Sequence, residues 1–135
     1  MILEINSKPI DFHQLVERSL NSILIVGATG EILYCNKACL DLLNIKSTTD
    51  IIFKNVCQFI HPPFHKICME RLTKVFLNQE TINTEVKMIR NNGEIIDIES
   101  IAAPFYLENQ VFAQIIMQNI TDHKLHKNIY MIGKS

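Results

Sequence analysis

The strongest constraint on the fold of this chain is a run of alternating residues in its last third. Between residues 82 and 101, apolar side chains alternate with polar ones, a period of two that is typical of a strand with one buried face. Asn92-Gly93 interrupts the run and predicts a tight primed turn, and residues 108–110 predict a second turn before a last strand over 111–120. Strands joined by such short turns pair in antiparallel order. Residues 82–120 therefore predict a three-stranded meander.

The N-terminal part of the chain predicts one helix followed by a second hairpin. Apolar residues at helical spacing predict a helix that is capped by Asp11 and ends near residues 21–22. Residues 23–26 and 32–35 are rich in β-branched and other apolar side chains and flank a turn that contains two glycines. These two segments predict a pair of antiparallel strands.

The segment between the hairpin and the meander is helical in pattern. Asn36 and Ser47 are suitable N-caps for two short helices. The longest helical pattern begins at Pro62-Pro63, where proline is tolerated because N–H groups in the first turn have no partner inside the helix. Because the helices are grouped between hairpin-connected strands, the order predicts an α+β fold with a five-stranded antiparallel sheet.

Composition and charge narrow the functional classes. The 135 residues fit one domain of ordinary size, and the formal net charge of −1 comes without clusters of Lys and Arg. Strong attraction to nucleic acid or to an anionic membrane surface needs such clusters. No apolar stretch approaches the ~18 residues needed to span a bilayer, and no signal peptide is visible. We therefore expect a cytoplasmic protein with no nucleic-acid or membrane partner.

Familiar catalytic and metal-binding patterns are absent from the sequence. It contains no Ser-His-Asp order, phosphate-binding glycine loop or HExxH element. Asp97 and Glu99 share one face of a strand, but this is expected to be the solvated face because Ile98 occupies the other. The cysteines form no C-x-x-C pair and are expected to be free thiols, at positions 35, 39, 57 and 68. The histidine pairs at 61 and 65 and at 123 and 126 are expected to be solvated, so we predict neither catalysis nor a metal site.

Several short segments, taken in their order along the chain, form a set. They are Ile23-Leu24-Ile25-Val26, Gly30-Glu31-Ile32-Leu33-Tyr34, Asn36-Lys37-Ala38, Ile60-His61-Pro62 and Asn92-Gly93. The set resembles the PAS domain, a sensory module common in bacterial signalling proteins, over about residues 10–127. Ile120-Thr121-Asp122 is similar to the Asp-Ile-Thr motif that ends the family's last strand, but Asn119 replaces the aspartate. A charge-based contact made by that aspartate is expected to be weakened or absent here.

The resemblance implies a five-stranded antiparallel sheet with helices on one face, often around a small-ligand cavity, with flanking helices at both ends. It divides the chain into an N-terminal flanking helix, the PAS domain and the start of a C-terminal signalling helix, over residues 1–21, 22–121 and 122–135. Leu125, Ile129 and Ile132 are spaced four and three apart, which is the rhythm of a short coiled-coil seam. We expect a homodimer through the N- and C-terminal helices.

A cavity of this kind would be lined by the inward sides of the long helix and the sheet. Periodicity places seven candidates there: Phe64, Cys68, Leu72, Met88, Ile98, Ile115 and Met117. The alternative is that the same residues are simply packed core. A lining of this composition favours a small, mostly apolar or planar ligand with few polar anchors.

Two coloured cofactors found in relatives are not expected here. The segment around Cys57 loosely resembles the signature of flavin-binding PAS domains, but Met117 stands at the position of the flavin-binding glutamine and cannot donate a hydrogen bond. Haem-binding relatives use a histidine on the long helix, where this chain has Cys68, and His65 falls on another side of the helix. We expect Cys57 to be a packing thiol. The sequence identifies no cofactor, and we expect neither flavin nor haem.

The resemblance to PAS domains therefore implies a non-catalytic sensory or regulatory domain. It would sense a small ligand or a partner and transmit the signal through a dimerising C-terminal helix. The effector, in the same chain or in another, would be a histidine kinase or diguanylate cyclase. The alternative is a ligand-free dimerisation or interaction scaffold.

Overall fold

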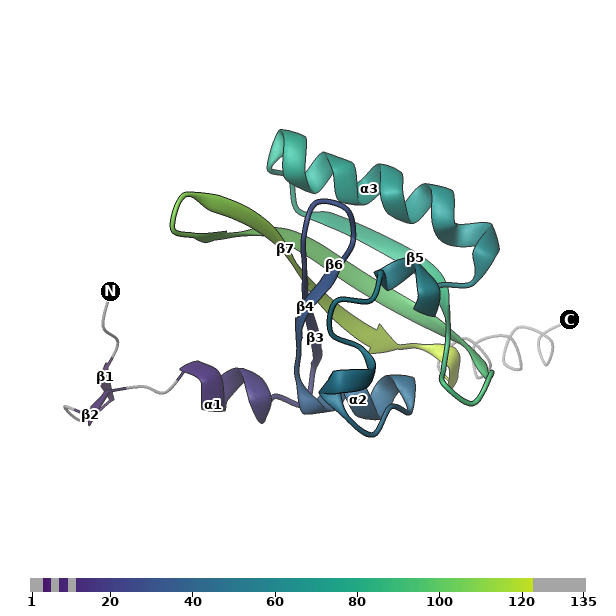
Figure 1. Cartoon of the computed structure of the whole chain (residues 1–135), viewed down its shortest axis with the longest axis horizontal. Helices are drawn as coiled ribbons and strands as arrows, with labels where there is room; N and C mark the ends of the chain where they lie inside the picture. Colours follow the sequence, from purple (N-terminus) through teal and green to yellow (C-terminus); the bar gives the residue numbers. More distant parts are fainter. Residues whose placement is uncertain (1–3, 6–7, 10–11, 123–135) are drawn as a thin grey trace, which may run out of the picture.

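A five-stranded antiparallel sheet forms the centre of the molecule (Figure 1). The structure, a computed structural model, describes residues 4–5, 8–9 and 12–122. The strand order is β4-β3-β7-β6-β5, and every neighbouring pair is antiparallel. The strands are β3 (Ser22–Val26), β4 (Ile32–Cys35), β5 (Ile82–Ile89), β6 (Ile95–Leu107) and β7 (Gln110–Asn119). This confirms the predicted α+β class, the strand number and the meander.

Two short segments near the N-terminus form a separate ladder that the sequence did not predict. β1 (Glu4–Ile5) pairs with β2 (Lys8–Pro9) in antiparallel order. A flanking helix was predicted over residues 1–21, but among the described residues of this range only α1 (Phe12–Glu17) is helical. The predicted cap, Asp11, lies outside the described residues.

The first helix ends earlier than its apolar spacing predicts. α1 stops at Glu17 instead of continuing to residues 21–22. The backbone carbonyl of Val16 accepts a hydrogen bond from Asn36 Nδ2 at 2.9 Å, and that of Asn21 accepts from the same atom at 2.9 Å. The bond to the Val16 carbonyl stands where the bond from Leu20 N would be if the helix continued.

The hairpin turns differ from the predicted ones in type. At the β5–β6 turn only Gly93 has a positive φ, of 87°, and Arg90 N donates to Glu94 O at 2.8 Å. Asn92 Oδ1 accepts from Glu94 N and holds a three-residue loop, so the expected two-residue primed turn is wrong. The primed turn lies instead between β6 and β7, where Glu108 and Asn109 have φ of 49° and 66°.

Helices and helical turns occupy the chain between β4 and β5. They are α2 (Lys37–Leu43), η1 (Thr48–Asp50), η2 (Val56–Phe59), η3 (Pro62–Phe64) and α3 (His65–Asn78). Asn36 and Ser47 cap α2 and η1 by accepting from Cys39 N and Thr49 N, as predicted. α3 runs across one face of the sheet in Figure 1. None of the described helices is long and apolar enough to cross a membrane.

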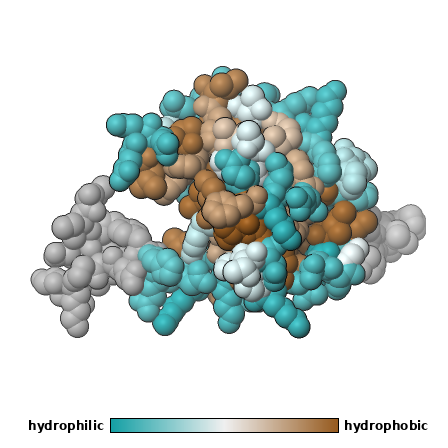
Figure 2. Space-filling model, viewed as in Figure 1, coloured by the Kyte–Doolittle hydropathy of each residue, from teal (hydrophilic) through white to brown (hydrophobic). Residues whose placement is uncertain are grey.

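Strand alternation decides which side chains form the core. On β6, Ile96 and Ile98 are buried toward the helices, while Asp97 on the opposite face pairs with Lys87 at 2.8 Å. Asp97 therefore lies on the face opposite the core, as predicted, although its side chain is only 15% exposed. On the side seen in Figure 2, hydrophilic residues predominate at the margins and apolar side chains reach the surface toward the middle.

Candidate functional site

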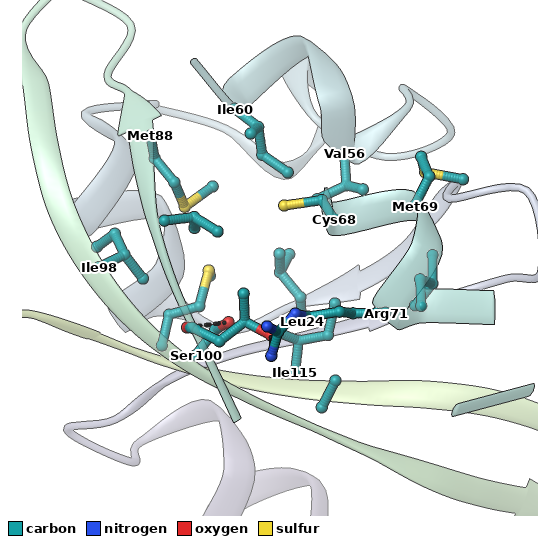
Figure 3. Close-up of a pocket in the computed structure, with 15 residues that line it drawn as sticks. Leu24, Val56, Ile60, Cys68, Met69, Arg71, Met88, Ile98, Ser100 and Ile115 are labelled. Carbon is teal, nitrogen blue, oxygen red and sulfur yellow. Dashed lines mark hydrogen bonds between the residues drawn. The ribbon is translucent and has the colours of Figure 1, made fainter. Parts of the chain in front are cut away.

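A cavity of about 60 Å³ lies between α3 and the inner face of the sheet (Figure 3). α3 forms one wall, the strands β3, β5, β6 and β7 form the opposite wall, and the segment around η2 closes one side. The lining residues are Leu24, Val56, Ile60, Cys68, Met69, Arg71, Leu72, Thr84, Val86, Met88, Ile98, Ser100, Ala102, Ile115 and Met117. Most of them are apolar, so the cavity offers its occupant a mainly hydrophobic wall.

Six of the seven candidates from the sequence lie together on this wall. They are Cys68, Leu72, Met88, Ile98, Ile115 and Met117. Phe64 does not line the cavity, because it belongs to the 3-10 turn before α3 and so does not follow the helical phase of that helix. Its ring instead faces His61, with ring centroids 6.3 Å apart, and packs against the edge of the core.

One corner of the cavity is polar, which was not predicted from the sequence. Arg71 Nη1 donates to the Asn83 backbone carbonyl at 2.9 Å and to Thr84 Oγ1 at 3.4 Å. Ser100 Oγ donates to the Thr84 carbonyl at 3.0 Å, and the two residues are cross-strand partners. Thr84 and Ser100 share the alternation of the buried strand residues, and Arg71 lies one turn after Cys68, but this spacing alone does not show that the Arg71 guanidinium reaches β5.

The cavity thiol is an apolar wall group at neutral pH. Burial raises the pKa of Cys68 to about 11, with a smaller contribution from nearby Cys57 and an opposing one from Arg71. Burial also raises the pKa of Cys57. A protonated thiol is a poor nucleophile and a poor metal ligand. All four cysteines are free thiols, as predicted.

Histidine and carboxylate side chains do not gather into a metal site in the part of the chain that the structure describes. No group of three or more His, Cys, Asp or Glu there could hold a metal ion. His65 Nε2 donates to the Ile60 carbonyl at 2.7 Å, which holds this ring against the turn before its own helix. The pair at 123 and 126 lies outside the described residues.

The end of the last strand is fastened to the start of β6. Ile120 N donates to the Asp97 carbonyl at 2.8 Å, and Asp97 N donates to Thr121 Oγ1 at 2.8 Å. Asn119 Oδ1 accepts from Thr121 N at 3.0 Å. The neutral amide of Asn119 therefore caps the exit from the domain with a hydrogen bond where the resemblance would place an aspartate.

The strand order, the helical layer on one face and the cavity between them define the architecture of this domain. A family model described as the PAS domain matches residues 20–122. The chain therefore belongs to the PAS domain family, which confirms the resemblance seen in the sequence.

Individual relatives agree with this assignment. Over 119 residues, or 88% of this chain, the sequence is 30% identical to Sporulation kinase A of Bacillus subtilis, of whose length it spans 20%. The PAS domain of a protein from Colwellia psychrerythraea is 25% identical with a TM-score of 0.74, covering 82% of this chain and 95% of that one. The PAS domain of an HTR-like protein from Haloarcula marismortui is 20% identical with a TM-score of 0.72, covering 81% and 88%.

Proposed function

We propose that this PAS domain, over residues 22–121, is a non-catalytic sensory module whose ligand is a small molecule held in the cavity between α3 and the sheet. The observation that carries the proposal is the cavity itself, because its walls come from two layers of the fold at once. A molecule that enters it contacts Leu72 on α3 and Ile98 on β6 together. Its binding therefore changes how the helix packs on the sheet.

The path from the cavity to the C-terminus is short. Met117 lines the cavity near the end of β7, and the same strand leads to Asn119 and Thr121, which are bonded to each other. Thr121 is also bonded to Asp97 on β6. A shift of the sheet against α3 thus reaches the residues that lead into the C-terminal tail.

The effector that receives the signal is proposed to be a histidine kinase or a diguanylate cyclase, in the same chain or in another. The similarity to a segment of Sporulation kinase A supports the first of these. The chain spans only 20% of that kinase, and we assign to this chain no kinase activity of its own.

Dimerisation is the proposed means of transmission. Leu125, Ile129 and Ile132 have coiled-coil spacing and lie outside the described residues. Near α1, Leu15 and Leu20 are 57% and 99% exposed and are available for the same interface. We expect a dimer in sedimentation equilibrium that dissociates when both isoleucines of the tail are replaced, in the variant I129D/I132D. A monomer at every concentration would contradict this part of the proposal.

Native mass spectrometry of freshly purified protein tests the ligand. We expect a mass excess that disappears on denaturation. The variant Ala102→Leu fills the cavity and should lack the excess, provided that circular dichroism shows it folded, since overpacking costs about 1–3 kcal/mol. Ala103→Leu is the matched control, because Ala103 is the next residue on β6 and faces the other side of the sheet. An unliganded mass in every variant would favour the ligand-free scaffold instead.

A further inference from the structure

The polar corner of the cavity offers a ligand hydrogen-bond donors from Arg71 and Thr84. Arg71 uses only Nη1 for its bonds to β5, and Nε and Nη2 have no hydrogen-bond partner among the described residues. The Thr84 hydroxyl accepts from Arg71 and keeps its own proton to donate. Ser100 already donates to the Thr84 carbonyl, so its hydroxyl oxygen can only accept. A ligand group placed beside Arg71 and Thr84 therefore meets donors and must itself accept.

The corner also carries a positive charge that the cavity does not neutralise. None of the fifteen lining residues is Asp or Glu. The ion pairs found between described residues are Lys87–Asp97 and Arg90–Glu94, and neither includes Arg71. A guanidinium with two adjacent N–H groups free matches a carboxylate, which accepts two parallel hydrogen bonds in the same plane.

The remainder of the cavity limits what can be attached to that acceptor. Leu24, Leu72 and Ile98 are nearly or fully buried and present only hydrocarbon, and the Cys68 thiol beside them is uncharged at neutral pH. A volume of about 60 Å³ holds roughly four to six water-sized groups, since a buried water needs about 10–15 Å³ by the same measure. The space thus fits a short hydrocarbon chain.

We infer that the ligand of this cavity is a short-chain aliphatic carboxylate. Its carboxylate binds Nε and Nη2 of Arg71 beside the Thr84 hydroxyl, and its hydrocarbon tail lies among Leu24, Leu72 and Ile98. Figure 3 shows the Arg71 side chain extending from α3 toward Ser100 and Leu24, so that charge and apolar wall belong to one site. This inference rests on the proposed ligand-binding function and adds the chemical class.

A titration with sodium butyrate, followed by the methyl NMR signals of the protein, tests the inference. We expect saturable shifts at Met88, Ile98 and Met117 that sodium chloride at equal ionic strength does not produce. Butyramide, which replaces the carboxylate by a neutral amide, should bind at least about tenfold more weakly. Charge-assisted hydrogen bonds of this kind correspond to about a tenfold to hundredfold difference in the dissociation constant.

Substitutions assign the effect to one side chain. Arg71→Met keeps the length of the side chain and removes the donors, and it should weaken butyrate binding by about tenfold to a hundredfold while leaving butyramide binding unchanged. Arg71→Lys keeps the charge but lacks the planar guanidinium. Its affinity for butyrate should therefore lie between that of Arg71→Met and that of the unaltered protein. Lys74→Met removes the same charge from an exposed position on α3 and should bind butyrate like the unaltered protein.

The outcomes separate this inference from the proposed function. Equal binding of butyrate and butyramide, or binding that survives Arg71→Met, would show a cavity ligand of another class and overturn the inference alone. Shifts confined to residues outside the cavity, or none at all, would overturn it as well. The proposed function would then depend on whether native mass spectrometry finds a different retained molecule. Because butyramide is tested on the unaltered protein, the conclusion does not depend on the folding of any variant.

Discussion

Replacing Asn36 by alanine is expected to lower the free energy of unfolding by about 3–5 kcal/mol. The Asn36 side chain is fully buried, and its Oδ1 accepts from Ile23 N and Cys39 N, each at 3.0 Å. Its Nδ2 donates to the carbonyls of Val16 and Asn21, each at 2.9 Å. Alanine would remove all four bonds. The Val16 carbonyl still accepts from Ser19 N and Cys39 N still donates to the Asn36 carbonyl, so the cost comes mainly from Ile23 N and the Asn21 carbonyl. An unsatisfied buried polar group costs about 1–3 kcal/mol. Urea denaturation followed by circular dichroism measures the loss.

Two further variants show whether the loss comes from this network. Asn36→Asp keeps the acceptor but sets a carboxylate against two carbonyl oxygens, so it should also be strongly destabilising. Asn78→Ala, at an exposed position at the end of α3, should change the unfolding free energy by no more than about 0.5 kcal/mol. A loss below about 1 kcal/mol in Asn36→Ala would mean that the four bonds do not hold α1, β3 and α2 together.

Replacing Ile98 by alanine is expected to cost about 2–5 kcal/mol, near the top of the range for a residue that is fully buried. Ile98 lies on the inner face of β6, contributes to the core and lines the cavity, so truncation removes buried hydrocarbon and enlarges an existing void. The same denaturation experiment measures the effect. The enlarged cavity should also admit a longer apolar tail than the unaltered protein does.

Ile101 provides a matched control on the same strand. It points to the opposite face of the sheet and is 41% exposed, so Ile101→Ala should cost less than about 1 kcal/mol in the monomer. The two substitutions remove the same atoms from positions three apart. Equal losses at both positions would contradict the assignment of inner and outer faces, which depends on the register of β6 with β5 and β7.

The sequence predicted the sheet well because strand alternation is a local signal. Thr84, Val86 and Met88 repeat every second residue, and the burial of their side chains follows that repeat. The predicted length of α1 was wrong because a side chain distant in the sequence determines where the helix ends. Asn36 Nδ2 donates to the Val16 carbonyl at that point. The predicted type of the β5–β6 turn was wrong because Asn92 Oδ1 accepts from Glu94 N and stabilises a longer loop.

Local periodicity also predicts the apolar wall of the cavity, but it does not predict the polar corner. Cys68 and Leu72 are four apart on one helix, and helical spacing alone places both on one face. Arg71 is charged, so its position in the pattern favours solvent, and only the structure shows its guanidinium bonded to β5. That contact depends on how α3 lies across the sheet, which no local pattern specifies.

A crystal structure determined under xenon pressure tests most directly whether the interior cavity on which this account depends is present. Xenon enters apolar cavities that are otherwise empty. We expect electron density, from xenon or from a retained small molecule, between α3 and the sheet in contact with Leu24, Leu72 and Ile98. Closely packed side chains at this place, with no density for either, would contradict a ligand-sensing role.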